Sequence, residues 1–266
     1  MKKTIAIILA LCCYTIVMAQ NSYRDLVQEF QMLSNGEHAR EMVLESYSKL
    51  AVQKGLSADA AHAAAVKFYD NEMYPTMINM AVEAFQGKVT EDDLKQIIKE
   101  YKTPAGKTAL ENSRKCSSPE NQQKLQAAMM PGVQSVIMGG AIQNVQAPAC
   151  SASYKQKFST YYKLANMSST FDAIISTLMG ALQAQMSNAD AEAMIGKIKN
   201  FFNDNSENIM LHACVDALTE SDLDFFNKVL DTEAGKRVTE ASQSITAKSA
   251  AYGVQSVTDF MNSLGN

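Results

Sequence analysis

The chain has 266 residues, of which 47% are hydrophobic, and its 24 basic and 28 acidic side chains give a formal net charge of −4. A general binder of nucleic acid or of anionic membranes carries a surplus of Lys and Arg, so this balance excludes both classes. With 12 Gly, 5 Pro and no Trp, the composition also excludes collagen-like, disordered and disulfide-dense chains, and it favours an all-α fold.

The N-terminus has the pattern of a secretory signal peptide. Lys2 and Lys3 precede an apolar run over residues 5–18, which ends at Ala19 before a polar stretch. The run is too short to span a bilayer with ease, and small residues stand where a signal peptidase requires them. We therefore predict a signal peptide over residues 1–19, cleaved after Ala19, and a mature protein in the periplasm or outside the cell.

A lipoprotein is the alternative interpretation of this N-terminus. Acylation would then fall on Cys12 or Cys13, but the residue before Cys12 is the bulky Leu11, and cleavage there leaves a very short apolar region. Cleavage after Ala19 is therefore favoured. No other stretch of the sequence is long and apolar enough to cross a membrane, so we expect no stable transmembrane segment in the mature chain.

The rest of the chain contains an internal repeat. Three pairs of segments match. Four of five letters agree between Thr90–Leu94 and Thr219–Leu223 and between Thr103–Lys107 and Thr232–Lys236, and all five agree between Gly132–Val136 and Gly253–Val257. The first two pairs are offset by 129 residues and the third by 121, so the first copy carries eight extra residues, most naturally in the loop Cys116–Asn121. The sequence therefore predicts two homologous tandem helical bundles, over residues 20–147 and 148–266.

The first signature segment of each repeat predicts the start of a helix. A threonine hydroxyl can accept a hydrogen bond from a free backbone N–H group, and an aspartate three residues later can close a capping box. A leucine then begins an apolar face with helical spacing. The residues are Thr90, Asp93 and Leu94 in the first repeat, and Thr219, Asp222 and Leu223 in the second.

The second signature segment predicts the start of the next helix. A threonine caps it, and a proline at its first position has no N–H group to lose. A glycine inside the first turn costs about 1 kcal/mol relative to alanine, so we expect it to permit the close approach of a neighbouring helix. A lysine can pair with a glutamate four residues later. The residues are Thr103, Pro104, Gly106, Lys107 and Glu111, with Thr232, Gly235, Lys236 and Glu240 in the second repeat.

A helix that begins Thr-Glu-x-Asp-Leu, followed by Thr-Pro-x-Gly-Lys at the start of the next helix, resembles the bacterial family called domain of unknown function 2059. The motif is complete in residues 90–107, and residues 219–236 carry it with Glu233 in the place of Pro104. The chain thus resembles two tandem members of this family over nearly all of its mature length. The resemblance implies an exported, all-helical module, and it implies no activity.

Three cysteines remain after the predicted cleavage site. Cys214 lies in an apolar helical stretch, where a buried cysteine behaves as a small apolar residue. Cys116 follows a helix in a polar turn, and Cys150 lies in the polar stretch before the second repeat. We therefore predict a disulfide between Cys116 and Cys150, worth about 4 kcal/mol. Three unpaired thiols remain the alternative.

The sequence offers no recognisable catalytic set. His38, His62 and His212 stand alone, without the HExxH pattern or a cysteine–histidine cluster of zinc spacing. No glycine-rich phosphate loop is present, since the glycines of the apolar run 129–142 fit a packed, kinked helix. We therefore expect no metal, no cofactor and no enzymatic activity.

Methionine is the one unusual component of the composition. The residues cluster in two places: Met73, Met77 and Met80, and Met129, Met130 and Met138. Such clusters fit an irregular helical core, an adaptable apolar groove or a Cu(I) site, and the core is favoured. Our leading hypothesis is a non-catalytic helical module of the bacterial envelope that binds a partner protein or peptide. The alternative is a carrier of an apolar small molecule in a Met-rich cavity.

Overall fold

The computed structural model describes residues 22–169, 171, 175 and 188–265. Helices make up most of this part of the chain, and it contains no β-strand, which confirms the predicted all-α class. None of the helices in it combines the length and the apolar character needed to cross a membrane. The predicted signal peptide, residues 1–19, lies outside the described residues.

The chain divides into two compact units. Unit 1 comprises Met1–Lys99 together with Ala251–Asn266, and unit 2 comprises Glu100–Ala250. Each unit therefore combines residues from both predicted repeats. The repeat domains 20–147 and 148–266 remain a prediction about the sequence, whereas the units describe how the helices pack.

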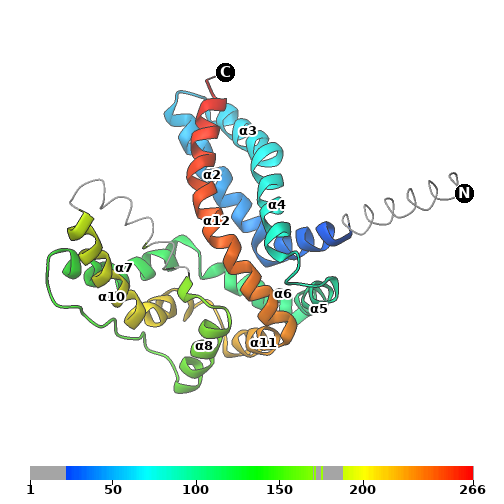
Figure 1. The fold of residues 1–266 in the computed structure, drawn as a ribbon. Coiled ribbons are helices and arrows are strands. Elements are labelled where there is room, and N and C mark those ends of the chain that lie inside the picture. The colour runs from blue at the N-terminus through cyan, green and yellow to red at the C-terminus, as the bar shows by residue number, and fades with distance from the viewer. Residues whose placement is uncertain (1–21, 170, 172–174, 176–187, 266) are drawn as a thin grey trace, which may run out of the picture. The chain divides into compact units, whose positions relative to one another are not determined.

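Unit 1 begins with a helical segment over residues 22–31 (Figure 1). The elements that follow are the π-helix η1 (Met32–Gly36), α2 (Glu37–Gln53), α3 (Ala58–Phe68), the π-helix η2 (Tyr69–Met73), α4 (Tyr74–Phe85), most of α5 (Glu91–Tyr101) and the last turns of α12 (Glu233–Ser263). In Figure 1, α2, α3, α4 and the C-terminal part of α12 run side by side.

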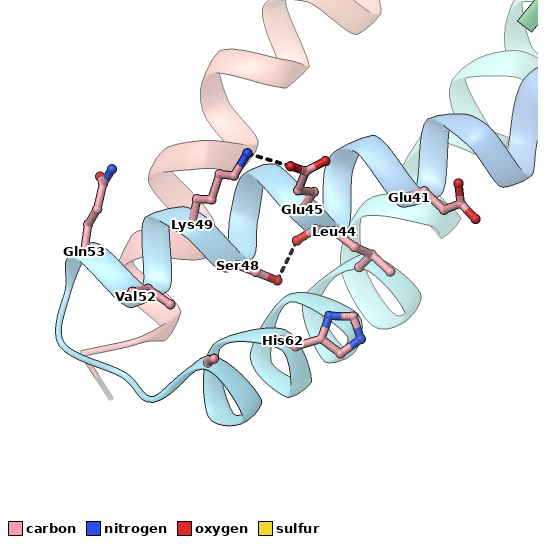
Figure 2. A pocket seen from close by; sticks show the side chains of 9 residues that line it. Glu41, Leu44, Glu45, Ser48, Lys49, Val52, Gln53 and His62 are labelled. Carbon is pink, nitrogen blue, oxygen red and sulfur yellow. Dashed lines mark hydrogen bonds and ion pairs between the residues drawn. The ribbon is translucent and has the colours of Figure 1, made fainter. Parts of the chain in front are cut away.

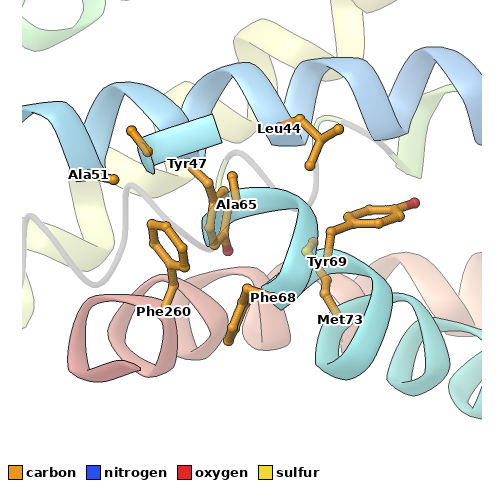
Figure 3. Packing of buried hydrophobic residues seen from close by; sticks show 9 residues of the cluster. Leu44, Tyr47, Ala51, Ala65, Phe68, Tyr69, Met73 and Phe260 are labelled. Atoms are coloured by element: carbon orange, nitrogen blue, oxygen red, sulfur yellow. The ribbon is translucent and has the colours of Figure 1, made fainter. Parts of the chain in front are cut away.

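An aromatic cluster holds α12 against α2 and α3 in unit 1. Figure 3 shows the ring of Phe260, whose centroid lies 4.8 Å from that of Tyr47 and 5.3 Å from that of Phe68. The hydroxyl groups of Tyr47 and Ser256 share a hydrogen bond of 2.7 Å, so the buried polar end of the tyrosine has a partner. Apolar burial and one buried polar contact thus fix the C-terminal helix in this unit.

Unit 2 contains the remaining helices of the described residues. They are α6 (Pro104–Lys115), α7 (Pro119–Ile137), α8 (Ala152–Leu164), α10 (Asn188–Cys214), α11 (Glu220–Leu230) and the first part of α12. Val133 and Val136 of α7 belong to the same buried cluster as Ile198 and Phe201 of α10. α11 packs against both α6 and α8, so unit 2 has a continuous apolar interior.

The packing exchanges the last helix of each predicted repeat. α7, which ends the first repeat, packs in unit 2 against α10 of the second repeat. The C-terminal part of α12, which ends the second repeat, packs in unit 1 against α2 and α3 of the first repeat. Each compact unit is therefore completed by a helix from the other predicted repeat.

The two copies of the first signature segment adopt the same local structure. The Asp93 N–H donates to the Thr90 hydroxyl over 3.2 Å, and the Thr90 N–H donates to the Asp93 carboxylate over 2.9 Å. The corresponding distances between Thr219 and Asp222 are 3.2 Å and 2.8 Å. α5 and α11 each begin one residue after the threonine and are 11 residues long. A capping box thus starts both helices.

The second signature segment also repeats its local structure. The N–H of Gly106 donates to the Thr103 hydroxyl over 3.1 Å, and the N–H of Gly235 donates to the Thr232 hydroxyl over 3.0 Å. Pro104 occupies the first position of α6. Both threonines therefore act as N-caps, of α6 and of α12.

The ion pairs of Lys236 differ from the predicted pair with Glu240. Its ammonium group lies 3.1 Å from the Asp231 carboxylate and 3.7 Å from that of Glu233. The short connection between α11 and α12 places both carboxylates on the N-terminal side of Lys236, so the side chain turns toward them. Hydrogen bonding to Asp231 raises the pKa of Lys236.

The first predicted repeat contains a break that the second lacks. Residues 116–118 separate α6 from α7, whereas the matching part of the second predicted repeat is the continuous helix α12. The predicted loop Cys116–Asn121 is thus a loop only in its first three residues, because residues 119–121 form the first turn of α7. α7 itself ends at Ile137, before the predicted end at residue 142, because Gly139 adopts the left-handed conformation that ends helices, with φ of 75°.

Removal of the Asp222 carboxylate is expected to destabilise the protein. This buried carboxylate accepts hydrogen bonds from the backbone N–H and the hydroxyl of Thr219 and from the Asn112 amide. Asp222→Ala leaves these donors without an acceptor, so we expect the free energy of unfolding to fall by about 2 kcal/mol in urea denaturation. Asp222→Asn keeps an acceptor oxygen and should lose less. Equal losses would contradict this account.

Candidate functional site

An open groove lies between α2 and α3 in unit 1 (Figure 2). Its volume is about 640 Å³, and apolar atoms make up most of its surface. The residues that line it are Glu41, Leu44, Glu45, Ser48, Lys49, Val52 and Gln53 of α2, with Ala58 and His62 of α3. Figure 2 shows the side chains of α2 on one side and His62 on the other.

The apolar part of this groove follows α2. Leu44 is buried, whereas Val52, the penultimate residue of the helix, leaves 47% of its surface exposed. Ser48 lines the groove midway between them, and its hydroxyl donates to the Leu44 carbonyl oxygen over 2.6 Å. Because the hydroxyl already has its acceptor inside the helix, the groove between Leu44 and Val52 offers an apolar surface to a partner.

Charged and polar groups form the rim. The Lys49 ammonium group lies 2.6 Å from the Glu45 carboxylate, and the hydrogen bond between them lowers the pKa of Glu45. Glu41 lies one turn before Glu45 on the same helix, and the exposed imidazole of His62 faces the groove from α3. An apolar surface with a charged rim is the usual composition of a protein-binding patch.

A second groove, of about 530 Å³, lies along α10 in unit 2 and is mostly polar. Here α10 holds the extended stretch between the predicted repeats. Asn205 accepts a hydrogen bond from the Val145 N–H over 2.6 Å, and Asn208 donates to the Val145 carbonyl oxygen over 2.9 Å. His212 contacts the Gln146 carbonyl oxygen over 2.9 Å. One face of α10 thus binds a peptide backbone that belongs to the chain itself.

The predicted signature residues lie in neither groove. They form the caps and first turns of α5, α6, α11 and α12, where their hydrogen bonds start helices. The two short segments that repeat most clearly in the sequence therefore have an architectural role. The grooves lie on α2, α3 and α10, outside these segments.

The three histidines are divided between the two units. His38 and His62 lie on α2 and α3 of unit 1, and His212 lies on α10 of unit 2. Among the described residues, no group of three or more His, Cys, Asp or Glu side chains is arranged to hold a metal ion. The expectation that the chain uses no metal or cofactor remains a prediction.

The methionines mostly fill gaps in the helical cores. Met73 is buried in the cluster of unit 1, Met77 packs against that cluster, and Met129 packs against the core of unit 2. Met130 and Met138 are exposed on or beside α7. None of these methionines lines the α2–α3 groove or the groove along α10.

Sequence reasoning missed both grooves. Val52 and His62 lie on different helices and meet only because α2 packs along α3. On α10, the spacing of Asn205, Asn208 and His212 by three and four residues places them on one helical face, and this signal is visible in the sequence. The role of this polar face is to bind the backbone around Val145, and only the structure shows that this stretch lies beside α10.

Comparison with known proteins gives one result. The family model described as "Uncharacterized protein conserved in bacteria (DUF2059)" matches residues 75–146. This match confirms the resemblance to that family for a segment that contains the complete signature, residues 90–107. The match does not cover the second predicted repeat. No match was found to a curated protein or to a solved structure.

Proposed function

We propose, from the match of residues 75–146 to this bacterial family and from the α2–α3 groove, that the chain is an exported, non-catalytic interaction module of the bacterial envelope. It binds an amphipathic helix of a partner protein in that groove. The observation that carries the proposal is the open, apolar groove beside the exposed side chain of Val52.

A helix in a groove suits the shape and the charge of this surface. α2 and α3 form two walls, and the apolar floor can accept side chains that a partner helix presents at intervals of three and four residues. Glu45 is paired with Lys49 on the rim, so Glu41 adds a negative charge that favours a partner helix with Lys or Arg beside its apolar residues. A negatively charged or strictly polar helix is disfavoured for the same reasons.

The open form of the groove favours a protein partner over a small apolar ligand. A carrier needs an enclosed apolar pocket of roughly 300 Å³ or more, in which most of the ligand surface is buried. The α2–α3 groove is large enough but opens to solvent. A carrier function would be detected as a lipid or another apolar molecule that co-purifies with the protein from its native envelope.

The proposal can be tested with two arginine variants, one inside the groove and one at an equally exposed position outside it. Val52 and Ile137 are almost equally exposed, at 47% and 48%, but only Val52 lines the groove. We expect Val52→Arg to reduce binding of the partner at least tenfold, because the arginine occupies the apolar surface, whereas Ile137→Arg should bind as the unaltered chain does. Mass spectrometry identifies the partner, and binding is then measured with the purified pair.

A photo-cross-linker at position 52 provides the second measurement. The cross-linked peptide should come from an amphipathic helix of the partner, and a cross-linker at position 137 should give no such product. Equal loss of binding for both arginine variants, or a cross-link to a lipid alone, would contradict the proposal.

A further inference from the structure

Two of the three cysteines of the predicted mature chain are neighbours in unit 2. The Lys124 ammonium group lies 2.8 Å from the Asp216 carboxylate, which holds the start of α7 beside the end of α10, and the Cys116 thiol is near enough to Cys214 to act on its pKa. Cys116 is the C-cap residue of α6, and Cys214 is the last residue of α10, so the two thiols lie at the ends of two helices. Cys214 is buried, Cys116 is half-buried and Cys150 is exposed. All three are free cysteines in the structure.

Backbone groups at both cysteines form hydrogen bonds. The Cys214 carbonyl oxygen accepts hydrogen bonds from the Tyr154 hydroxyl over 3.1 Å and from the N–H groups of Ala217 and Leu218 over 3.0 Å and 2.9 Å. The Cys116 N–H donates to the Ser113 carbonyl oxygen over 3.1 Å. These hydrogen bonds hold the backbone in place at both cysteines.

Burial also decides the order in which the two thiols react. The neighbouring Cys116 thiol, together with burial, raises the pKa of the Cys214 thiol. A thiol with a raised pKa is a poor first nucleophile, and its buried position keeps a bulky oxidant away. Cys116 is the more accessible member of the pair, and therefore the one that meets an external disulfide first.

We propose that Cys116 and Cys214 form a disulfide that joins α6 to α10, and that Cys150 remains a thiol. This pairing differs from the Cys116–Cys150 bridge expected from the sequence, because the folded chain brings the segment after α6 beside the end of α10, where Cys214 lies. The bond crosses from the first predicted repeat to the second. It therefore ties together two parts of unit 2 that are distant in sequence.

The oxidant is an external disulfide, such as oxidised glutathione or an envelope dithiol–disulfide oxidoreductase. The Cys116 thiolate attacks one sulfur of that disulfide, which releases one thiolate and leaves a mixed disulfide on Cys116. The Cys214 thiolate then attacks the Cys116 sulfur and releases the second thiolate. The two cysteines lose two protons and two electrons, and the external disulfide is reduced to two thiols. The predicted export places the chain where such oxidants act.

Peptide mapping of the full chain distinguishes the possible bridges. Trypsin places the three cysteines in three different peptides, over residues 116–124, 125–155 and 200–228. After equilibration with oxidised glutathione and digestion without reductant, we expect peptide 116–124 joined to 200–228, with peptide 125–155 unlinked and open to alkylation. A link between 116–124 and 125–155, or three alkylated cysteines, would overturn the proposal.

Thermal melts of the oxidised chain provide an independent readout. The bond closes a loop of roughly 100 residues, so oxidation should raise Tm by about 10 °C relative to the chain in reductant. Cys150→Ser should keep the whole shift, and Cys116→Ala should abolish it without placing a polar group in a buried site. Cys214→Ala should abolish it as well. A shift that survives Cys116→Ala, or one that is lost in Cys150→Ser, would contradict this pairing.

Discussion

Gly106→Ala is expected to lower the stability of the protein, although alanine is the better helix former by about 1 kcal/mol. A Cβ atom on Gly106 would lie 2.4 Å from the Glu100 carbonyl oxygen and 2.8 Å from that of Tyr101. Both neighbours are backbone atoms at the end of α5, so relief of the contact requires a shift of the chain. We expect a net loss of 2–3 kcal/mol, about 4–10 °C in Tm.

Gly235 should behave in the same way at the matching position. Its Cβ atom would lie 2.4 Å from the Val229 carbonyl oxygen, at the end of α11. Gly196 is the control, because it lies inside α10 and a Cβ atom there would meet nothing within 4 Å. Gly196→Ala should raise stability by about 0.5–1 kcal/mol.

Thermal melts of the three alanine variants decide the matter. An unchanged or raised Tm for Gly106→Ala and Gly235→Ala would contradict the account based on close contact. The structure also specifies what approaches the glycine: it is the last turn of the preceding helix, rather than a separate neighbouring helix. The Thr-Pro-x-Gly-Lys segment is therefore a tight corner between consecutive helices, which explains its glycine without a ligand.

The helices of the signature segments could be predicted because their causes are local. A threonine and an aspartate three residues apart are enough to start a helix, and a proline at position 104 is enough to begin the next. The end of α7 was harder to predict, because Gly139 ends the helix only through the left-handed conformation that it adopts.

The packing partners could not be predicted from local signals. The hydroxyl groups of Tyr47 and Ser256 are 209 residues apart in sequence, and nothing near either residue identifies the other. Amphipathic spacing shows that a helix buries one face, but it does not show which helix covers that face. The exchange of the last helices and the α2–α3 groove both depend on which helices pack together, so only the structure shows them.

Because packing partners are not encoded locally, two identical pentapeptides have opposite predicted responses to the same substitution. The sequence Gly-Val-Gln-Ser-Val occurs at residues 132–136 in α7 and at residues 253–257 in α12. A Cβ atom on Gly132 would lie 2.2 Å from the ring of Phe201, which is fully buried against Phe202. A Cβ atom on Gly253 would meet nothing within 4 Å.

Gly132→Ala should therefore destabilise the protein by about 2 kcal/mol, because the enclosed ring of Phe201 has little room to move. Gly253→Ala should stabilise it by about 1 kcal/mol, because the substitution improves helix propensity without a new contact. Urea denaturation measures the free energy of unfolding of the two single variants. We expect the effects of the same substitution in the two identical pentapeptides to differ by about 3 kcal/mol. Equal effects would mean that α7 and the end of α12 occupy equivalent environments. A difference of the expected sign supports the packing of α7 against α10.

A double variant tests the same contact. Phe201→Leu should restore part of the stability lost in Gly132→Ala, because the smaller side chain makes room for the added methyl group.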